Sequence, residues 1–353
     1  MTSSLKNKTL RAVLYLHFLS ALVADDRLFL KQAKTLENKT IAGRSIKFIS
    51  GDVIFTKGNL ILNCQEGRHY EKNDLAVLYK KVSAIQEQRT LTCDTIKFFS
   101  KEDRLLSIGS SHILDPDYDL KADSITVFTK QDSGVALGNV ILKQKGQTIK
   151  ANRIEYQKDK DQDGVSYTAI GDVIIEDSLR IATCGKAKYD RKNEVTTLEV
   201  EPKITEDERV LSGEKIILQY NKEELERLHI PKKAFAVTPI EGFQRSRSDS
   251  TEIGDTLKYA DRMEGSQLTS YFENGKLDSL RIVGMAKTLY HVFEDSIYQG
   301  KNNASGDTII MMFMENELNT LKIIGGSEGK YVPDSIANDV DLPVIYSANY
   351  IKY

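Results

Sequence analysis

An eight-residue pattern of apolar and polar positions recurs along most of this chain. In residues 91–98 the first, third, sixth and eighth positions are apolar, and the two central positions are polar. Successive copies are 21, 29, 29, 29, 33, 29, 52 and 41 residues apart. A period near thirty is typical of stacked architectures, in which no single unit buries its own apolar face. The third residue of every copy is small: Gly43, Cys64, Cys93, Ala122, Ala151, Cys184, Gly213, Gly265 and Gly306.

The alternation within each copy predicts a strand with a bulge at its centre. Side chains on a strand alternate between its two faces, so the first and third residues share one face, whereas the sixth and eighth share the other. An extra residue at the polar dipeptide between them, such as Asp94-Thr95 or Asn152-Arg153, returns both pairs to one side. Repeated in every copy, this bulge predicts a bent, two-sided sheet around a continuous apolar interior, with the small residue at the crowded corner.

A second motif lies between the copies and consists of a glycine that follows an apolar residue in most cases. Such glycines mark turns or bulges, where the backbone takes a positive φ or approaches a neighbour closely. Together the two motifs give two or more short strands in every thirty residues, so the chain is predicted to be all-β and solenoid-like. The glycines are Gly51, Gly109, Gly138, Gly171, Gly284 and Gly325.

The repeats divide the chain into two blocks, a regular one over residues 40–220 and a looser one over residues 254–353. Residues 221–253 are predicted to be an irregular insertion. It would begin with a short helix capped by Asn221 and ended by Pro231, and continue in an exposed polar loop around residues 244–250.

Residues 1–24 have the character of a secretory signal peptide. Basic residues come first, a run of thirteen mostly apolar residues follows from Ala12 to Ala24, and Asp25 begins a polar region. Such a run is short for a membrane span. Leu22 is not the usual small residue before a cleavage site after Ala24, so an uncleaved anchor in the inner membrane is the alternative. We expect an exported protein.

Composition and spacing argue against several functional classes. The net charge is -2 and no Lys/Arg cluster occurs, which argues against nucleic-acid binding. The five histidines are widely separated, and residues 159–164 resemble the start of a calcium loop but have Ile170 where the bidentate acid is required. No catalytic residue, metal site or cofactor is predicted, and the chain is not expected to be an enzyme.

The three cysteines all occupy the small position of the repeat. An odd number excludes a complete disulfide framework. Export would permit a bond between Cys64 and Cys93, but we favour small buried thiols that fill the corner.

The repeated apolar positions are the candidate functional residues. They are expected to line one side of the bent sheet, either as a closed core or as a trough that accepts acyl chains, and periodicity does not separate these two interpretations. The residues are Leu91, Ile96, Phe98, Leu120, Ile125, Val127, Val140, Ile149, Ile154, Tyr156, Val173, Leu211, Ile216 and Leu218.

The repeats resemble the OstA-like family, well over residues 40–220 and more loosely over residues 254–330. The resemblance rests on glycine turns such as Gly138-Asn139-Val140, which are followed by copies such as residues 120–127 and 149–156. This family comprises the periplasmic lipopolysaccharide (LPS) transport protein LptA and the periplasmic domain of the outer-membrane assembly protein LptD. The resemblance implies a bent β-jellyroll whose V-shaped interior shields the acyl chains of lipid A.

The resemblance also implies a location and partners. It places the chain in the periplasm, as part of a bridge that passes LPS toward the outer membrane. LptC-like and LptD-like components would join it strand edge to strand edge, and self-association by the same edges is a further expectation. The alternative function is an exported, closed β-solenoid that serves as a scaffold or adhesin without a lipid groove.

Overall fold

The computed structural model describes residues 27–158, 165–206, 208–222, 224–245, 253–314, 317–334 and 342–352. The predicted signal peptide, the acidic loop 159–164 and the polar loop at 246–252 lie outside the described residues.

The described chain is built of β-strands and two single-turn 3-10 helices, η1 (Glu71–Asn73) and η2 (Ser100–Glu102). All strands belong to one sheet, so the predicted all-β class is confirmed. The strands are β1 (Phe29–Gln32), β2 (Thr35–Ile41), β3 (Arg44–Lys57), β4 (Leu60–Tyr70), β5 (Leu75–Gln86), β6 (Arg89–Phe99), β7 (Arg104–Leu114), β8 (Asp119–Phe128), β9 (Ser133–Gln144), β10 (Gln147–Lys158), β11 (Val165–Glu176), β12 (Arg180–Asp190), β13 (Val195–Glu199), β14 (Lys203–Glu206), β15 (Arg209–Ser212), β16 (Lys215–Asn221), β17 (Glu224–Ile230), β18 (Ala234–Arg245), β19 (Ile253–Gly265), β20 (Gln267–Glu273), β21 (Lys276–Glu294), β22 (Ile297–Met314), β23 (Glu317–Pro333) and β24 (Val344–Lys352).

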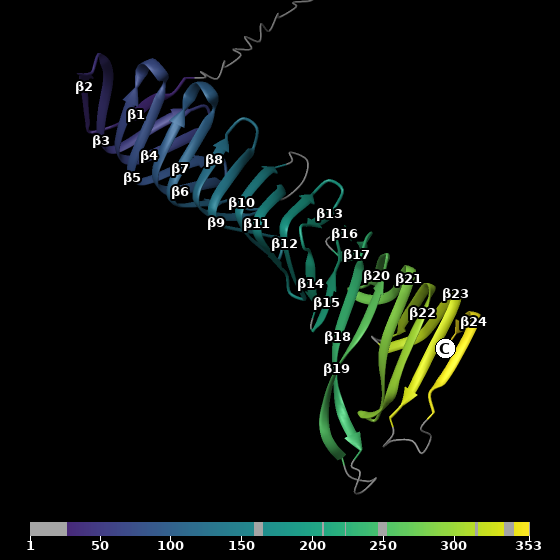
Figure 1. Cartoon of the computed structure of the whole chain (residues 1–353). Coiled ribbons are helices and arrows are strands. Elements are labelled where there is room, and N and C mark those ends of the chain that lie inside the picture. Colours follow the sequence, from purple (N-terminus) through teal and green to yellow (C-terminus); the bar gives the residue numbers. More distant parts are fainter. Residues whose placement is uncertain are drawn as a thin grey trace, which may run out of the picture.

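Long strands bend near their middle and so contribute to two walls of the sheet. β3, for example, pairs with β2 before its bend and with β1 after it. The first wall carries the turns at 58–59, 87–88, 115–118, 145–146 and 177–179. The second wall carries the turns at 71–74, 100–103, 129–132 and 191–194. Strand follows strand along an elongated, curved stack (Figure 1).

The bend lies where the sequence predicts it and uses the predicted glycines. The register of β6 with β7 shifts between Thr92 and Thr95. On β7, Gly109 has φ +79° and the next residue, Ser110, has φ +41°. A Cβ on Gly109 would lie 2.1 Å from Oδ2 of Asp94, because that side chain crosses the bend. The same left-handed backbone occurs at the other five glycines of the motif: Gly51, Gly138, Gly171, Gly284 and Gly325.

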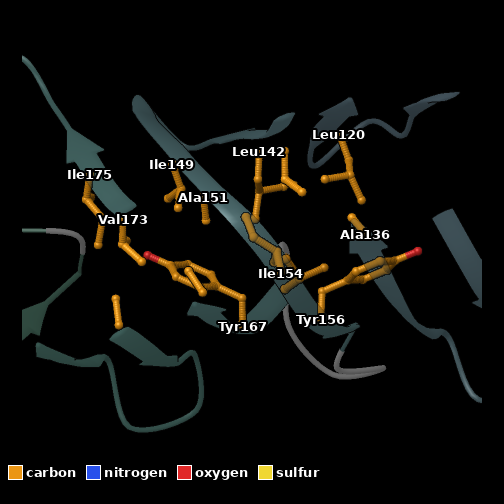
Figure 2. Close-up of a cluster of buried hydrophobic side chains, with 14 of the residues drawn as sticks. Leu120, Ala136, Leu142, Ile149, Ala151, Ile154, Tyr156, Tyr167, Val173 and Ile175 are labelled. Atoms are coloured by element: carbon orange, nitrogen blue, oxygen red, sulfur yellow. The ribbon is translucent and has the colours of Figure 1, made fainter. Parts of the chain in front are cut away.

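One continuous hydrophobic cluster fills the space between the walls. It extends from Leu28 at the N-terminal end to Ile323 on β23. Figure 2 shows its centre, where Ile154 of β10 lies among side chains that include Leu142 and Tyr167 of the neighbouring strands. Because strand side chains alternate, most strands send apolar residues into this interior and polar residues to solvent, whereas β2 has none in the cluster.

The predicted helix after Asn221 is wrong. The residues form β17, which pairs with β16 and with β20. Leu225 and Leu228 are both buried, and their separation of three resembles one face of a helix. A bulge causes this spacing, because the register with β16 shifts at Glu226 and returns both leucines to the interior.

The described part of the predicted insertion is also regular rather than irregular. β17 lies in the second wall, and β18 pairs with β15 and β19 in the first wall. The sheet therefore continues without interruption from the first block into the second.

The hairpin of β18 and β19 extends beyond the neighbouring strands (Figure 1). β15 follows β18 only as far as the pair Val210–Val237, whereas β18 continues to its end against β19. A buried hydrogen bond, with Nδ1 of His291 2.8 Å from Oδ1 of Asp261, connects the hairpin to β21. Burial raises the pKa of the Asp261 carboxyl, although the hydrogen bonds from His291 oppose this shift.

We predict that Gly138→Ala lowers the free energy of unfolding by more than Gly146→Ala does. Both glycines have a left-handed backbone, with φ of +76° and +74°, which costs an alanine roughly 1–2 kcal/mol. At Gly138 the added Cβ would also lie 2.3 Å from Oδ2 of Asp123, whereas at Gly146 it meets nothing within 4 Å. Urea unfolding of both variants measures the difference, and equal losses would mean that the bend is not sterically constrained.

Candidate functional site

The fourteen residues predicted to line the interior all lie there. Each is between 0% and 6% exposed, and all fourteen belong to the one hydrophobic cluster. Where one long strand carries several of these fourteen residues, the bend places some of them in the first wall and the others in the second. On β6, Leu91 lies in the first wall, and Ile96 and Phe98 lie in the second, so they face one another across the V.

Side chains from the two walls meet and fill the central part of the interior. Ile125, Leu142 and Ile154 are 0% exposed. The Tyr156 ring extends across Gly134, where a Cβ would come within 2.6 Å of its hydroxyl, and its centroid lies 6.0 Å from that of Tyr118. The sequence left open a closed core or a trough. In this structure the side chains of these strands pack as a closed core.

Three tyrosine hydroxyls are buried in this interior with no hydrogen-bond partner among the described residues. They belong to Tyr118, Tyr156 and Tyr167. Burial raises the pKa of all three phenols, so they stay protonated at neutral pH. Each hydroxyl can therefore donate one hydrogen bond to an oxygen that enters the interior.

The side of the V opposite the bend is closed by ion pairs between turns or strand ends of the two walls, which we call the mouth contacts. They are shielded from solvent to different degrees, with side-chain exposures from 3% at Asp115 to 33% at Asp132. The median surface pair contributes about 0–1 kcal/mol, and shielding strengthens the attraction but adds a desolvation cost that offsets much of the gain. The nitrogen–oxygen distances are 2.6 Å for Lys57–Asp103, 3.1 Å for Arg89–Asp132 and 3.1 Å for Lys158–Asp115.

Sequence reasoning missed the mouth contacts, because charged residues in turns are common and usually only solvated. A weak signal was present. The partners in the contacts Arg89–Asp132 and Lys158–Asp115 are 43 residues apart, and so are Lys57 and the carbonyl of Ser100 to which its ammonium also donates. The ion pair Lys57–Asp103 spans 46 residues. The separation is nearly constant because each contact joins turns or strand ends about one and a half repeats apart in a regular stack.

Hydrogen bonds keep the carboxylates of Asp103 and Asp115 ionised. Burial alone would raise the pKa of Asp115, but the backbone N–H of Asp117 and the side chains of Arg89 and Lys158 hold it below its usual value. The pKa of Asp103 is lowered in the same way, by two lysines that outweigh the effect of burial.

Both ends of the sheet present a strand edge that no described strand covers. β1 and β2 pair only with β3, and β24 pairs only with β23. Every residue of β2 is exposed, and on β24 the side chain of Ile345 is 76% exposed. Such edges offer backbone N–H and C=O groups to a strand of another chain.

The three cysteines are free thiols near the bend. Burial raises the pKa of Cys64, Cys93 and Cys184 to about 11, so little thiolate forms at neutral pH. Within the described ranges, no three His, Cys, Asp or Glu side chains are grouped to hold a metal, and no helix is long and apolar enough to cross a membrane.

Residues 119–224, from β8 to the start of β17, match the family model described as LptA/(LptD N-terminal domain) LPS transport protein. This segment belongs to the LptA/LptD N-terminal family. It contains all the predicted interior residues except Leu91, Ile96 and Phe98. The resemblance inferred from the repeats is confirmed there, and the family is one of transport proteins rather than enzymes.

One solved structure with some similarity is that of LptH, the LptA homologous periplasmic component of the LPS transport device of Pseudomonas aeruginosa. It covers 31% of this chain and 79% of its own, with 20% sequence identity and a TM-score of 0.28. No curated protein matches the chain.

We predict that Ile154→Ala lowers the free energy of unfolding by about 2–5 kcal/mol, as expected for a cavity in a packed core. Ile170→Ala on the adjacent strand is the matched control. Ile170 is 37% exposed on the outer face of the bend, so its loss should stay below about 1 kcal/mol. Chemical denaturation distinguishes the two, and similar losses would show that the interior is loosely packed.

The mouth contacts should stabilise the protein at neutral pH and fail in acid. The pKa values of Asp103 and Asp115 are lower in the folded chain, so their stabilisation is complete above the unfolded value of about 3.9 and is lost as pH falls through the folded value. Urea unfolding at neutral pH and near pH 3 should therefore show a smaller acid loss for the Asp103→Asn/Asp115→Asn variant than for the unaltered chain. Equal acid losses would show that the contacts contribute no stability.

Proposed function

We propose that this chain is an LPS transport protein that carries lipid A acyl chains along the interior between its two walls. The observation that carries the proposal is the family match of residues 119–224 on a segment whose apolar interior continues, strand by strand, into the rest of the sheet. Acyl chains need such a path, because each methylene kept out of water contributes about 0.8 kcal/mol.

The geometry supports a specific path for the lipid. The polypeptide chain passes from one wall to the other only at the bend. The walls can therefore separate on the opposite side when the mouth contacts break. Acyl chains would then replace side-chain contacts such as those of Ile125, Ile154 and Phe98, while the sugar headgroup remains in solvent at the mouth. The free hydroxyls of Tyr118 and Tyr156 would donate to ester or amide oxygens of the lipid.

The partners and location follow from the same proposal. A bridge across the periplasm needs other Lpt components at both ends, and the exposed edges of β2 and β24 suit strand addition by LptC-like and LptD-like proteins or by a second copy. Movement of the lipid is driven by energy supplied elsewhere.

The filled interior favours one alternative, a closed β-solenoid that acts as an exported scaffold or adhesin. A scaffold needs packing and no lipid, and the 0% exposure of residues such as Leu120 and Ile149 is what such a core requires. The two functions differ in whether LPS reaches the interior.

A photo-reactive phenylalanine analogue at Phe98 tests the proposal in cells that make LPS, with the same analogue at Phe99 as the matched control. Phe98 is 0% exposed in the interior, whereas the adjacent Phe99 faces outward beneath the Arg104 guanidinium, whose carbon lies 3.8 Å from its ring centre. We expect LPS adducts at position 98 and not at 99. No adduct at either position in the folded protein would support the closed scaffold instead.

A further inference from the structure

The mouth of the V is not closed to the same degree along the stack. Over β3 to β11 the mouth contacts and the side chain of Gln144, whose Oε1 accepts from the Val165 amide at 3.1 Å, hold the walls together. Between Gln144 and Tyr220 only a small cavity of about 40 Å³ remains. The last contact across the mouth in this series is that of the Arg180 guanidinium, 5.3 Å from the Phe272 ring centre.

Immediately beyond Arg180 the walls leave a cavity of about 430 Å³, which we call the side opening. This volume lies within the range of roughly 300–1,000 Å³ that is usual for small-ligand sites. Past this point the ion pairs between described residues stay within the first wall or lie at the bend, as in Lys287–Glu264 and Lys233–Glu214. The cavity is lined by Leu179, Arg209 and Thr238 of the first wall and by Lys276, Leu277 and Phe313 of the second.

The strand pattern explains why the opening lies here. In the first wall β15 is only four residues long, and β18 runs past it into the projecting hairpin with β19. The line of turns that closes the mouth over the preceding strands is therefore displaced at β18. The opposing turn of the second wall, between β20 and β21, carries Gly275 and is left without a facing turn.

The opening leads into the hydrophobic interior. Phe313 and Phe272 are only partly buried but pack against the same cluster that contains Ile154. Leu277 pairs with Phe272 across the β20–β21 ladder, so the two side chains lie on the same face. An apolar chain that passes Leu277 and Phe313 would therefore reach the interior without breaking a mouth contact.

The rim of the opening carries positive charge from both walls. Arg209 lies on the first wall and Lys276 on the second, and neither forms an ion pair with a described residue. Of the two acidic residues at the rim, Glu206 is held by Arg180 at 2.8 Å, which leaves Glu208 as the opposing charge. Arginine and lysine are the side chains that recognise phosphate groups.

From these observations we propose that the side opening is the lateral entry site for an acylated, phosphorylated glycolipid. The acyl chains pass between Leu277 and Phe313 into the interior, and Arg209 and Lys276 bind phosphate groups of the headgroup. This inference rests on the proposed transport function and locates the point at which the lipid enters this chain.

The test ties the opening shut in the full chain and measures how fast purified protein captures fluorescent LPS. Glu208→Cys/Asn274→Cys is linked across the opening by a short bis-maleimide, and the untied form of the same variant is its reference. Both residues are exposed, Glu208 at the first-wall rim and Asn274 beside Gly275 in the opposing turn, and the variant keeps Arg209 and Lys276. Gln88→Cys/Gln131→Cys is the matched control, because these exposed glutamines flank the mouth contact Arg89–Asp132. The native thiols, with pKa values of about 11, should react little with the reagent.

We expect the tie at the opening to slow LPS capture by at least about tenfold and the control tie to leave its rate within about twofold, because only the first blocks the entry step. Equal slowing by both ties would mean that lipid enters along the whole mouth, and no slowing by either would mean entry at an end of the stack. Both results would overturn the proposal. If the untied variants and the unaltered chain capture no LPS at all, the transport function itself fails.

Discussion

The structure depends on one backbone constraint, the sharp bend that turns the two halves of each long strand toward each other. On β3, β7, β9, β11, β21 and β23 the bend has two successive residues with positive φ, a glycine and the residue after it, as at Gly138 and Asn139, and on β5 the two residues are Lys80 and Lys81. The polar side chain of the neighbouring strand crosses the space where a Cβ would be, as Asp123 does at Gly138. Without the bend the apolar pairs of one strand would face opposite sides, and no interior would form. With it, each added hairpin extends both walls and the cluster between them.

The same constraint explains why so much of the fold could be predicted from the sequence. A period of 29 residues, a bulge required by the odd spacing of apolar positions, and glycines in register with it are all local signals. They located the bend and the fourteen interior residues. The pair Leu225 and Leu228 misled, because a bulge in a strand and a turn of helix give the same spacing of three. The break in the repeat also misled, because the described residues after it form the regular strand β18.

Long-range pairings were beyond sequence reasoning. The mouth contacts join turns or strand ends 43 or 46 residues apart, and nothing local distinguishes Lys57 or Asp132 from other charged residues at such positions. Whether the interior is open or filled depends on the distance between the walls, which periodicity does not encode. The side opening arises because β18 extends beyond the end of β15. This difference is visible only when the strands are paired.

A filled interior and a transport role are compatible if the walls part only when lipid replaces the side-chain contacts. A partly shielded ion pair is worth little more than the 0–1 kcal/mol of the median surface pair, whereas every buried methylene contributes about 0.8 kcal/mol. A few methylenes therefore offset one mouth contact, and the contacts can break and re-form in turn as a lipid moves along the stack. Such a structure would protect its interior when empty.

The most direct test of this account is the distance between spin labels at Gln88 and Gln131, which flank a mouth contact on opposite walls, measured by pulsed electron resonance without and with bound LPS. We expect one short separation in the empty protein and a second, longer separation whose population grows with LPS concentration. An unchanged distribution in protein saturated with LPS would show that the interior between these walls does not carry the lipid.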